Sequence, residues 1–229
     1  MKHAFLIIAH NNPEILYAQL EILDSVDVDF YFHLDAKMEI NKSDLESHAL
    51  KSNIYYIEPK KIRWGHYSLT ECEIRLLKAA VMCKTEYDYY HMLSGVDMPI
   101  KTLDTIDAFF TANKGKEFIH FASKSVDEST KERISLYHIC PGRFHWQRKI
   151  NGLAVKIQRI IGINRLNKLK WEVKKGSNWF SITDRFAKYL IEHENLIAKQ
   201  FKYCFAGDEI FLQTILFNSK MKFELYMDT

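Results

Sequence analysis

The sequence predicts an α/β fold with a mostly parallel central sheet, and two observations support this. Strand-like and helix-like segments alternate through the first 120 residues, a pattern typical of folds in which helices cover a parallel sheet. The first expected strand, Ala4–Ala9, is a continuous apolar run of the kind buried inside such a sheet. With 229 residues, 47% of them apolar, the chain can form one globular domain with a sizeable core.

The first strand is followed by a segment with clear helix-start chemistry. Asn12 is the expected N-cap, and Pro13 suits the first helical position because its fixed φ angle matches the helix. This helix is expected to run to about Leu23. The next two strands are expected at Val28–Leu34 and Ile54–Ile57.

A Ser-x-x-Glu pattern, formed by Ser68 and Glu71, predicts a capping box at the start of a long helix. That helix is expected to continue to about Cys83. Three further elements complete this half of the chain: a strand at Tyr87–Leu93, a helix at Leu103–Thr111 and a strand at Phe118–Phe121.

The second half contains a strongly basic segment. From Arg143 to Lys175 there are ten Lys or Arg residues and a single acidic residue, Glu172. Within it, Leu153–Ile163 has the apolar spacing of a short amphipathic helix with a basic face.

Four elements are expected after the basic segment. They are a strand at Ser177–Ile182, a helix from Asp184 to about Ala198, a helix opened by Gly207-Asp208-Glu209 and ending near Phe217, and a last strand at Lys222–Leu225. One domain spanning 1–229, with a basic insertion around 143–175, is the simplest organisation.

Composition excludes several classes of protein. The charged fraction of 27% and the net charge of +3 are ordinary, which disfavours disorder and specialised nucleic-acid binding. None of the four cysteines forms a CxxC pair, so we expect reduced thiols in a reducing compartment. The apolar run at the N-terminus is too short for a signal sequence or a membrane span. No GxGxxG or GxxxxGK[ST] motif is present, which disfavours dinucleotide enzymes and P-loop NTPases.

Polar clusters follow three of the expected strands. They are Ala9-His10-Asn11, His33-Leu34-Asp35-Ala36-Lys37 and Ser94-Gly95-Val96-Asp97. Ligands of open α/β sheets bind at the carboxyl ends of the strands, so these clusters are candidates for a binding site. A carboxylate such as Asp35 is well placed there to accept hydrogen bonds from a ribose or a base.

These segments resemble the core-2/I-branching β-1,6-N-acetylglucosaminyltransferase family (glycosyltransferase family 14), which also contains the peptide xylosyltransferases. The resemblance spans nearly the whole chain in family order, and the Ser-Gly-x-Asp-x-Pro-Ile segment is its most specific part. The matching segments are Ala9-His10-Asn11, His33-Leu34-Asp35-Ala36-Lys37, Arg63-Trp64-Gly65-His66-Tyr67-Ser68, Met92–Lys101, Gly176-Ser177-Asn178-Trp179-Phe180 and Gly207-Asp208-Glu209.

The resemblance implies a GT-A fold, a UDP-sugar donor, inversion at the anomeric carbon and no required metal or other cofactor. Metal-dependent GT-A enzymes use an Asp-x-Asp motif after a central strand. The triplet Asp27-Val28-Asp29 precedes its strand instead, and we interpret it as surface charge. Glu209 matches the family's catalytic base, which takes the proton of the attacking acceptor hydroxyl. Its expected place at a helix start favours the ionised form.

The resemblance also implies roles for residues at the donor site. Asp35 matches a uridine-contacting residue; the alternative is a solvated charge at a strand end. Trp64 matches an aromatic side chain at the donor, or else anchors a loop. The full donor-binding set is Ala9, His10, Asn11, Asp35, Ala36, Lys37, Trp64, Ser94, Gly95 and Asp97, although His10 is equally suited to a structural role. Gly176, Ser177, Trp179 and Asp208 are expected to position donor or acceptor, with Trp179 equally suited to the core; Pro99 and Ile100 are expected to pack.

The residues that neutralise the departing diphosphate are not identified by the resemblance. Family members use basic residues beyond the base, whereas here only Lys220 and Lys222 follow Glu209, and neither maps onto them. A C-terminally shortened chain is therefore expected. The segment from Arg143 to Lys175 is an alternative source of cations.

Several functional alternatives stay open. The donor is UDP-N-acetylglucosamine or UDP-xylose, and the acceptor a glycan, lipid-linked glycan or peptide; a non-catalytic nucleotide-sugar-binding or scaffold protein is the alternative outside enzymes. The basic helix fits an anionic membrane surface or a solvated basic face equally well, and nucleic acid is disfavoured. We expect a bacterial, cytoplasmic protein, with peripheral attachment to the inner membrane as the variant that the basic segment suggests.

Overall fold

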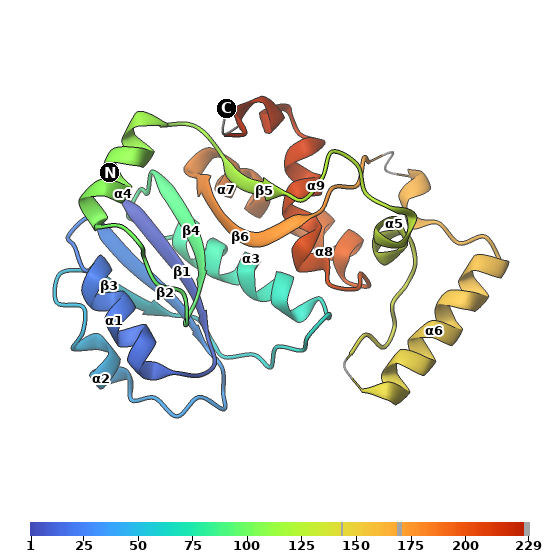
Figure 1. Ribbon diagram of the computed structural model, residues 1–229, viewed down its shortest axis with the longest axis horizontal. Coiled ribbons are helices and arrows are strands. Elements are labelled where there is room, and N and C mark those ends of the chain that lie inside the picture. The colour runs from blue at the N-terminus through green and yellow to red at the C-terminus, as the bar shows by residue number, and fades with distance from the viewer. Residues whose placement is uncertain (143, 169–170, 227–229) are drawn as a thin grey trace.

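In the computed structural model, which describes residues 1–142, 144–168 and 171–226, the chain folds around one six-stranded sheet (Figure 1). The strand order is β3-β2-β1-β4-β6-β5. The first four strands of this order are parallel, β6 runs antiparallel to β4, and β5 runs antiparallel to β6. The strands are β1 (His3–Ala9), β2 (Val28–Leu34), β3 (Asn53–Tyr56), β4 (Tyr89–Ser94), β5 (Phe118–Phe121) and β6 (Gly176–Thr183). The predicted α/β class with a mostly parallel sheet is confirmed.

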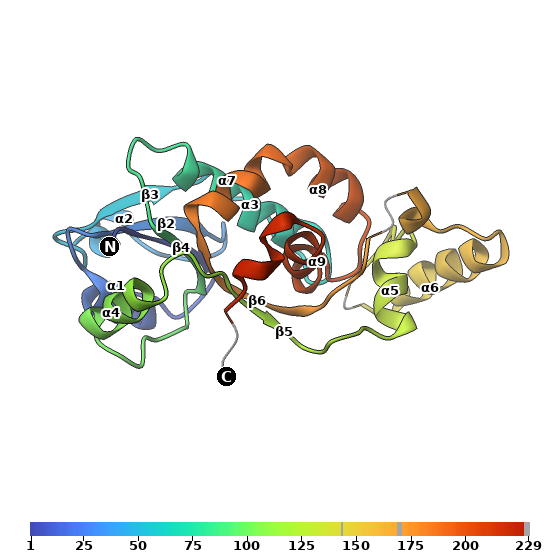
Figure 2. The same cartoon turned by 90° about the horizontal axis from the view of Figure 1, so that it is seen from above.

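Helices cover both faces of this sheet (Figure 2). They are α1 (Pro13–Leu23), α2 (Lys42–Glu46), α3 (Ser68–Val81), α4 (Leu103–Ala112), α5 (Glu128–Ser135), α6 (His145–Ile160), α7 (Asp184–Glu192), α8 (Glu194–Phe201) and α9 (Phe211–Phe217). Short 3-10 segments are η1 (Arg165–Lys168), η2 (Gly207–Glu209) and η3 (Lys220–Glu224). Three residues of the predicted basic insertion, Arg143, Leu169 and Lys170, lie outside the described residues, as do Met227–Thr229.

Successive side chains of β1 point into two different cores, as the two-residue period of a strand requires. Ala4 and Leu6 belong to a large cluster with α3, α7, α8 and α9. Phe5, Ile7 and Ala9 belong to a second cluster with apolar side chains of α1 and α2. Burial on both faces explains why β1 is apolar at every position after His3.

The helix starts differ from the predicted ones in their local chemistry. Pro13 does occupy the first turn of α1, but Asn12 adopts a left-handed conformation, with φ of 53°, and its side chain makes no capping bond. At α3 the N-cap is Tyr67, so the predicted capping box is wrong. Ser68 Oγ instead accepts from the backbone N–H of Arg63, and Glu71 pairs with a lysine.

The C-terminal third also differs from the prediction. The single helix expected from Asp184 to Ala198 is interrupted at His193, giving α7 and α8. The segment Lys222–Leu225 is not a strand, because Lys220–Glu224 forms η3 and Leu225 makes one isolated bridge to Glu117.

Other corrections concern single residues and short elements. The carboxylate of Asp29 is buried and accepts hydrogen bonds from Tyr87 Oη and Asn53, so only Asp27 of the Asp27-Val28-Asp29 triplet is surface charge. Ile100, expected to pack, is 91% exposed. Helices α2 and α5 were not predicted, because neither has a clear apolar repeat; α5 has only Ile134 as a fully buried apolar residue.

Candidate functional site

The carboxyl ends of three parallel strands meet at one edge of the sheet. In the strand register Ala9 lies beside Leu34, and Ile8 beside Ser94. Two hydrogen bonds extend these ladders past the strand ends: Asp35 N–H donates to the Ala9 carbonyl at 2.9 Å, and Gly95 N–H to the Ile8 carbonyl at 3.0 Å. The three predicted polar segments, Ala9–Asn11, Asp35–Lys37 and Ser94–Asp97, therefore lie together, and we call them the strand-end cluster.

The strand-end cluster offers both backbone and side-chain groups to a ligand. His10, Asn11, Ala36 and Lys37 are exposed. Asp35 is half-buried, and its Oδ1 accepts from the Lys37 N–H at 2.9 Å, which closes a tight turn. A carboxylate fixed in this way at an exposed strand end is preorganised to accept hydrogen bonds from a nucleoside.

Close packing explains why glycine follows Ser94. A Cβ on Gly95 would lie 2.6 Å from Ala9 Cβ, closer than such atoms approach, and 3.1 Å from its Cα. The end of β4 can therefore lie against the end of β1 only without a side chain here.

Asp97 connects the strand-end cluster to β6. Its Oδ2 accepts from the Ser94 N–H at 2.7 Å and from Trp179 Nε1 at 2.6 Å, while Gln19 Nε2 donates to the Asp97 carbonyl at 2.9 Å. Trp179 is 47% exposed, so it is not a core residue. Asp97 thus holds the indole ring at the edge of the site.

Glu209, the expected base, lies between two cations. Arg133 Nη2 donates to its Oε2 at 2.9 Å, and Lys175 Nζ lies 3.3 Å from the same oxygen. Partial burial works to raise the pKa of this carboxyl, but the hydrogen bond and charge of Arg133, with the charge of Lys175, outweigh it and lower the pKa below its usual value. A half-exposed carboxylate is held ionised here, as a general base must be.

The reason for this ionisation differs from the predicted one. Glu209 lies in the 3-10 segment η2, and α9 begins only at Phe211, so Glu209 is not a residue of a helix N-terminus. The two neighbouring cations, and not a helix dipole, favour its charged form.

Arg133 was missed in the sequence and organises this part of the site. Its side chain is only 15% exposed and donates to the carbonyls of Phe205 and Ala206, at 2.9 and 2.6 Å, as well as to Glu209. The same loop is strained at Ala206, where φ is 47°. Arg133 comes from α5, which has no apolar periodicity, and no sequence signal marks it.

The loop that carries Trp64 is joined to the loop that carries Glu209. The Ala206 N–H donates to the Gly65 carbonyl at 2.9 Å. The rings of Trp64 and Phe205 meet edge to face with centroids 5.5 Å apart. Gly65 has φ of 71°, and a Cβ there would lie 2.7 Å from the Phe205 ring. Trp64, 52% exposed, therefore lies on a loop bonded to the segment that leads into the expected base.

Two further carboxyls lie close to the base: Asp208 interacts with Glu209, and Glu73 interacts with Asp208. Burial, followed by the charge of Glu209, raises the pKa of Asp208. Burial, followed by the charge of Asp208, raises the pKa of Glu73 on α3 well above its usual value. The amide of Asn178 lies near enough to favour ionised Glu73, but no described group makes a well-formed hydrogen bond to either carboxyl oxygen. Burial therefore favours the neutral form of Glu73.

Gly176 and Ser177 are fixed by the sheet. A Cβ on Gly176 would lie 1.7 Å from the His120 carbonyl oxygen, so glycine lets β6 approach β5. Gln213 Nε2 donates to the Ser177 carbonyl at 2.6 Å and ties β6 to α9. The glycine at position 176 thus serves the approach of two strands of the protein itself.

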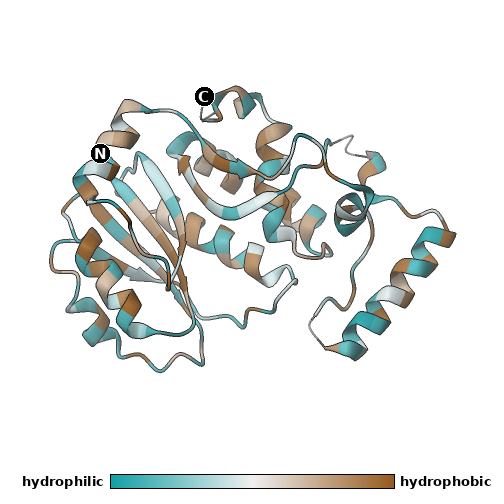
Figure 3. Cartoon of the chain, viewed as in Figure 1, coloured by the Kyte–Doolittle hydropathy of each residue, from teal (hydrophilic) through white to brown (hydrophobic). Residues whose placement is uncertain are grey.

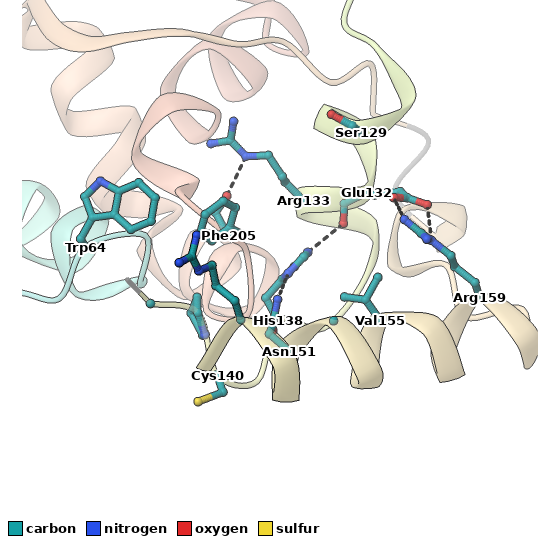
Figure 4. A pocket seen from close by; sticks show the side chains of 14 residues that line it. Trp64, Ser129, Glu132, Arg133, His138, Cys140, Asn151, Val155, Arg159 and Phe205 are labelled. Carbon is teal, nitrogen blue, oxygen red and sulfur yellow. Dashed lines mark hydrogen bonds and ion pairs between the residues drawn. The ribbon is translucent and has the colours of Figure 1, made fainter. Parts of the chain in front are cut away.

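A pocket of about 480 Å³ opens on the far side of Trp64 and Phe205 (Figure 4). Arg133, whose guanidinium contacts Glu209, forms part of its wall, and the rest comes mainly from α5, α6 and the chain between them. Arg148, Arg159 and His138 also line it. Of the predicted donor-site residues only Trp64 lines this pocket; the strand-end cluster does not.

A metal-binding group of side chains and a membrane-spanning helix are both absent from the residues that the structure describes. Across 1–142, 144–168 and 171–226, no three His, Cys, Asp or Glu side chains are grouped so that they could hold a metal ion. In the same part of the chain no helix has the length and apolar character needed to cross a membrane.

The chain is similar to known proteins. Xylosyltransferase 2 of Rattus norvegicus is 23% identical over 199 residues, and the xylosyltransferase oxt of Drosophila melanogaster is 23% identical over 200 residues. Each match covers 83% of this chain but only 21% of the relative, so the chain spans about a fifth of their length.

Solved structures with a similar arrangement include the apo form of mouse xyloside xylosyltransferase 1. It has a TM-score of 0.46 and 11% identity, and the match covers all of this chain and 85% of that one. Another is S. aureus TarS 1–349 in complex with UDP-GlcNAc, with a TM-score of 0.39 and 13% identity over 57% of this chain and 38% of that one.

The family match is far more extensive. The model described as "Core-2/I-Branching enzyme" matches residues 3–228, which include every segment that carried the resemblance. The α/β sheet, with its polar cluster at the carboxyl ends of parallel strands, is the GT-A type of architecture that this family implies. The chain belongs to the Core-2/I-branching enzyme family, a family of glycosyltransferases.

Proposed function

We propose that the chain transfers a sugar from a UDP-sugar to an acceptor hydroxyl, with inversion at the anomeric carbon and without a metal. The observation that carries this proposal is the environment of Glu209. It is a half-exposed carboxylate, held ionised by Arg133 and Lys175, in the Asp-Glu position of a chain that matches the family from residue 3 to 228. In a single displacement, Glu209 takes the proton of the attacking hydroxyl while UDP leaves from the opposite face of the sugar.

The donor is assigned to the strand-end cluster and to the strand β6 beside it. Asp35 accepts hydrogen bonds from the uridine, and backbone groups of Ala9–Asn11 and Ser94–Gly95 line the nucleoside site. Trp179, held by Asp97 at 2.6 Å, and Trp64 enclose the sugar from two sides. Gly176, Ser177 and Asp208 position this wall.

Lys175 is the candidate cation for the diphosphate. It ends the basic segment, its side chain is 36% exposed, and its ammonium already lies beside the base. Arg133 is the less exposed of the two cations and is committed to the Phe205 and Ala206 carbonyls. A more exposed ammonium can turn toward a departing phosphate while the guanidinium stays on the carboxylate.

The acceptor is assigned to the pocket beyond Trp64 and Phe205. Its wall contains Arg133, which also contacts Glu209, so a glycan bound there has its hydroxyls near the base.

The donor sugar is N-acetylglucosamine in our first assignment. Xylose is the second candidate, because the curated relatives are named xylosyltransferases.

The test begins with calorimetric titration of UDP, UDP-N-acetylglucosamine and UDP-xylose in the presence of EDTA. We expect metal-free binding, and we expect Asp35→Ala to weaken the binding of UDP about tenfold or more, as for loss of a hydrogen bond to a charged group. Absence of binding to any of the three ligands would remove the UDP-sugar assignment.

The role of Glu209 is tested separately by Glu209→Gln. Loss of general-base catalysis should lower the rate of transfer by about 10²–10⁴-fold while UDP binding is retained. Glu21→Gln is the matched control, since Glu21 is an exposed carboxylate of α1 paired with His48. A chain that binds nucleotide sugar without turning it over, the scaffold alternative, would show no transfer in either variant or in the wild type.

A further inference from the structure

Helix α6 carries its apolar side chains on the solvent side. At 100° per residue, five of them fall within an arc of about 80° on the helix surface. All are exposed: Trp146, Ile150, Leu153, Ile157 and Ile160. Leu153 is 62% exposed and Ile160 76%. We call these five residues the apolar stripe of α6.

The side of α6 that faces the protein is attached through polar side chains, and Val155 is the apolar residue of this side that lines the pocket. Gln158 is buried; its Oε1 accepts from the Tyr137 N–H at 2.7 Å, and its Nε2 donates to the Tyr137 carbonyl at 2.8 Å. Asn151 Nδ2 lies 2.9 Å from His138 Nδ1. The helix is therefore inverted relative to an ordinary surface helix, which buries its apolar face and exposes its polar one.

The position of α6 gives the stripe free access. In both cartoon views the helix lies at the end of the molecule away from the sheet (Figures 1 and 2). Apolar and polar residues mix along it when the ribbon is coloured by hydropathy (Figure 3). None of its residues belongs to either hydrophobic core cluster. Two further exposed apolar residues, Phe144 and Ile161, flank the helix in the chain.

The positive charge of α6 indicates which kind of surface the apolar stripe fits. The helix contains Arg148, Lys149, Lys156 and Arg159, and the sequence has no Asp or Glu from Arg143 to Trp171. Lys149 and Lys156 lie along one border of the stripe, about 20–40° outside it on the helix surface. Their long side chains can reach phosphates while the stripe is immersed. A second copy of this chain would bring the same positive charge and be repelled.

We propose that α6 lies in the headgroup region of an anionic lipid bilayer, with the apolar stripe inserted and Lys149 and Lys156 on lipid phosphates. An apolar arc that includes Trp, bordered by lysines on an exposed helix, has the composition of an interfacial anchor. The proposal rests on α6 alone and holds whether or not the chain transfers a sugar.

Flotation with lipid vesicles tests it on the whole chain. We expect binding to vesicles that contain phosphatidylglycerol, weaker binding to pure phosphatidylcholine, and loss of the difference at high salt. Leu153→Glu with Ile157→Glu should lower partitioning at least about tenfold, because two apolar side chains leave the lipid. Lys149→Glu with Lys156→Glu should remove the preference for anionic lipid.

Leu50→Glu is the matched control. Leu50 is an apolar side chain that is 84% exposed and lies between α2 and β3, far from α6 in the chain, so its replacement should leave vesicle binding unchanged. Thermal unfolding followed by circular dichroism verifies that each variant is folded. Fluorescence of Trp146 gives a second readout: a blue shift on adding anionic vesicles should disappear in Trp146→Phe.

Three outcomes would overturn the proposal. The wild type binds no anionic vesicle, or the Leu153→Glu, Ile157→Glu variant binds like the wild type. Alternatively, sedimentation equilibrium shows a dimer of the wild type that this variant disperses, with no lipid binding by either protein; the stripe is then a contact between copies of the chain.

Discussion

The buried carboxyl of Glu73 should make the stability of the protein fall as the pH rises. Glu73 is 1% exposed, lies next to Asp208, and has no well-formed hydrogen bond to either oxygen from a described group. Burial and the charge of Asp208 raise its pKa in the folded protein. The folded chain therefore keeps this proton at a pH at which the unfolded chain has lost it.

The sign and the size of the effect follow from proton linkage. Above the unfolded pKa, near 4.3, the unfolded state binds fewer protons than the folded state, so the free energy of unfolding decreases with pH. The contribution of one such group is about 1.4 kcal/mol per pH unit, until the pH passes the pKa of the folded state. Glu73→Gln keeps the shape of the neutral side chain and removes this dependence. Relative to the wild type, the variant should gain stability steadily as the pH rises above about 5.

Urea unfolding of both proteins at several pH values between 4 and 8 measures this difference. Glu71→Gln on the same helix is the control; it removes an exposed ion pair with Lys60 and should change the free energy of unfolding by about 1 kcal/mol or less. A difference between wild type and Glu73→Gln that is constant across the pH range would refute the reasoning. It would mean that Glu73 is ionised in the folded protein and is satisfied by groups such as Asn178.

Two further predictions concern Gly176 and Arg133. Gly176→Ala should lower the free energy of unfolding by about 1–3 kcal/mol or more, because its Cβ would lie 1.7 Å from a backbone oxygen of β5. Gly152→Ala is the control, since nothing lies within 4 Å of a Cβ at this position of α6. It should be neutral or stabilising in the same urea assay. Arg133→Gln removes the main group that lowers the pKa of Glu209. The acid limb of the pH profile of kcat/KM should therefore move to higher pH. An unmoved limb would show that Glu209 is not the titrating base.

The sequence was most informative where burial dictates pattern. The apolar run of β1 and the alternation of strands with helices predicted the parallel sheet, and the polar clusters after β1, β2 and β4 predicted three segments that do lie together. The family resemblance is confirmed by the match over residues 3–228. The catalytic and binding roles of the individual residues stay predictions.

The rest depended on contacts between residues distant in sequence. Arg133 reaches Glu209 from 76 residues away and lies on a helix with little apolar periodicity, so its role has no local signature. Ser68 and Glu71 had the correct spacing for a capping box but found other partners in the loop before the helix. The helix in the basic segment was predicted as Leu153–Ile163, yet it begins at His145, because the apolar spacing starts at Trp146.

Helix α6 is attached to the rest of the molecule through polar contacts, so it can be replaced without disturbing either hydrophobic core. Its attachment depends on the amide groups of Gln158 and Asn151 and on an exposed ion pair between Arg159 and Glu132, and it shares no side chain with either core. Replacement of the helix therefore leaves the sheet and both cores intact, and changes the side of the pocket beside Arg133 that α6 supplies. Within a lineage, one catalytic body can keep its chemistry while successive versions of this helix bring it to different surfaces.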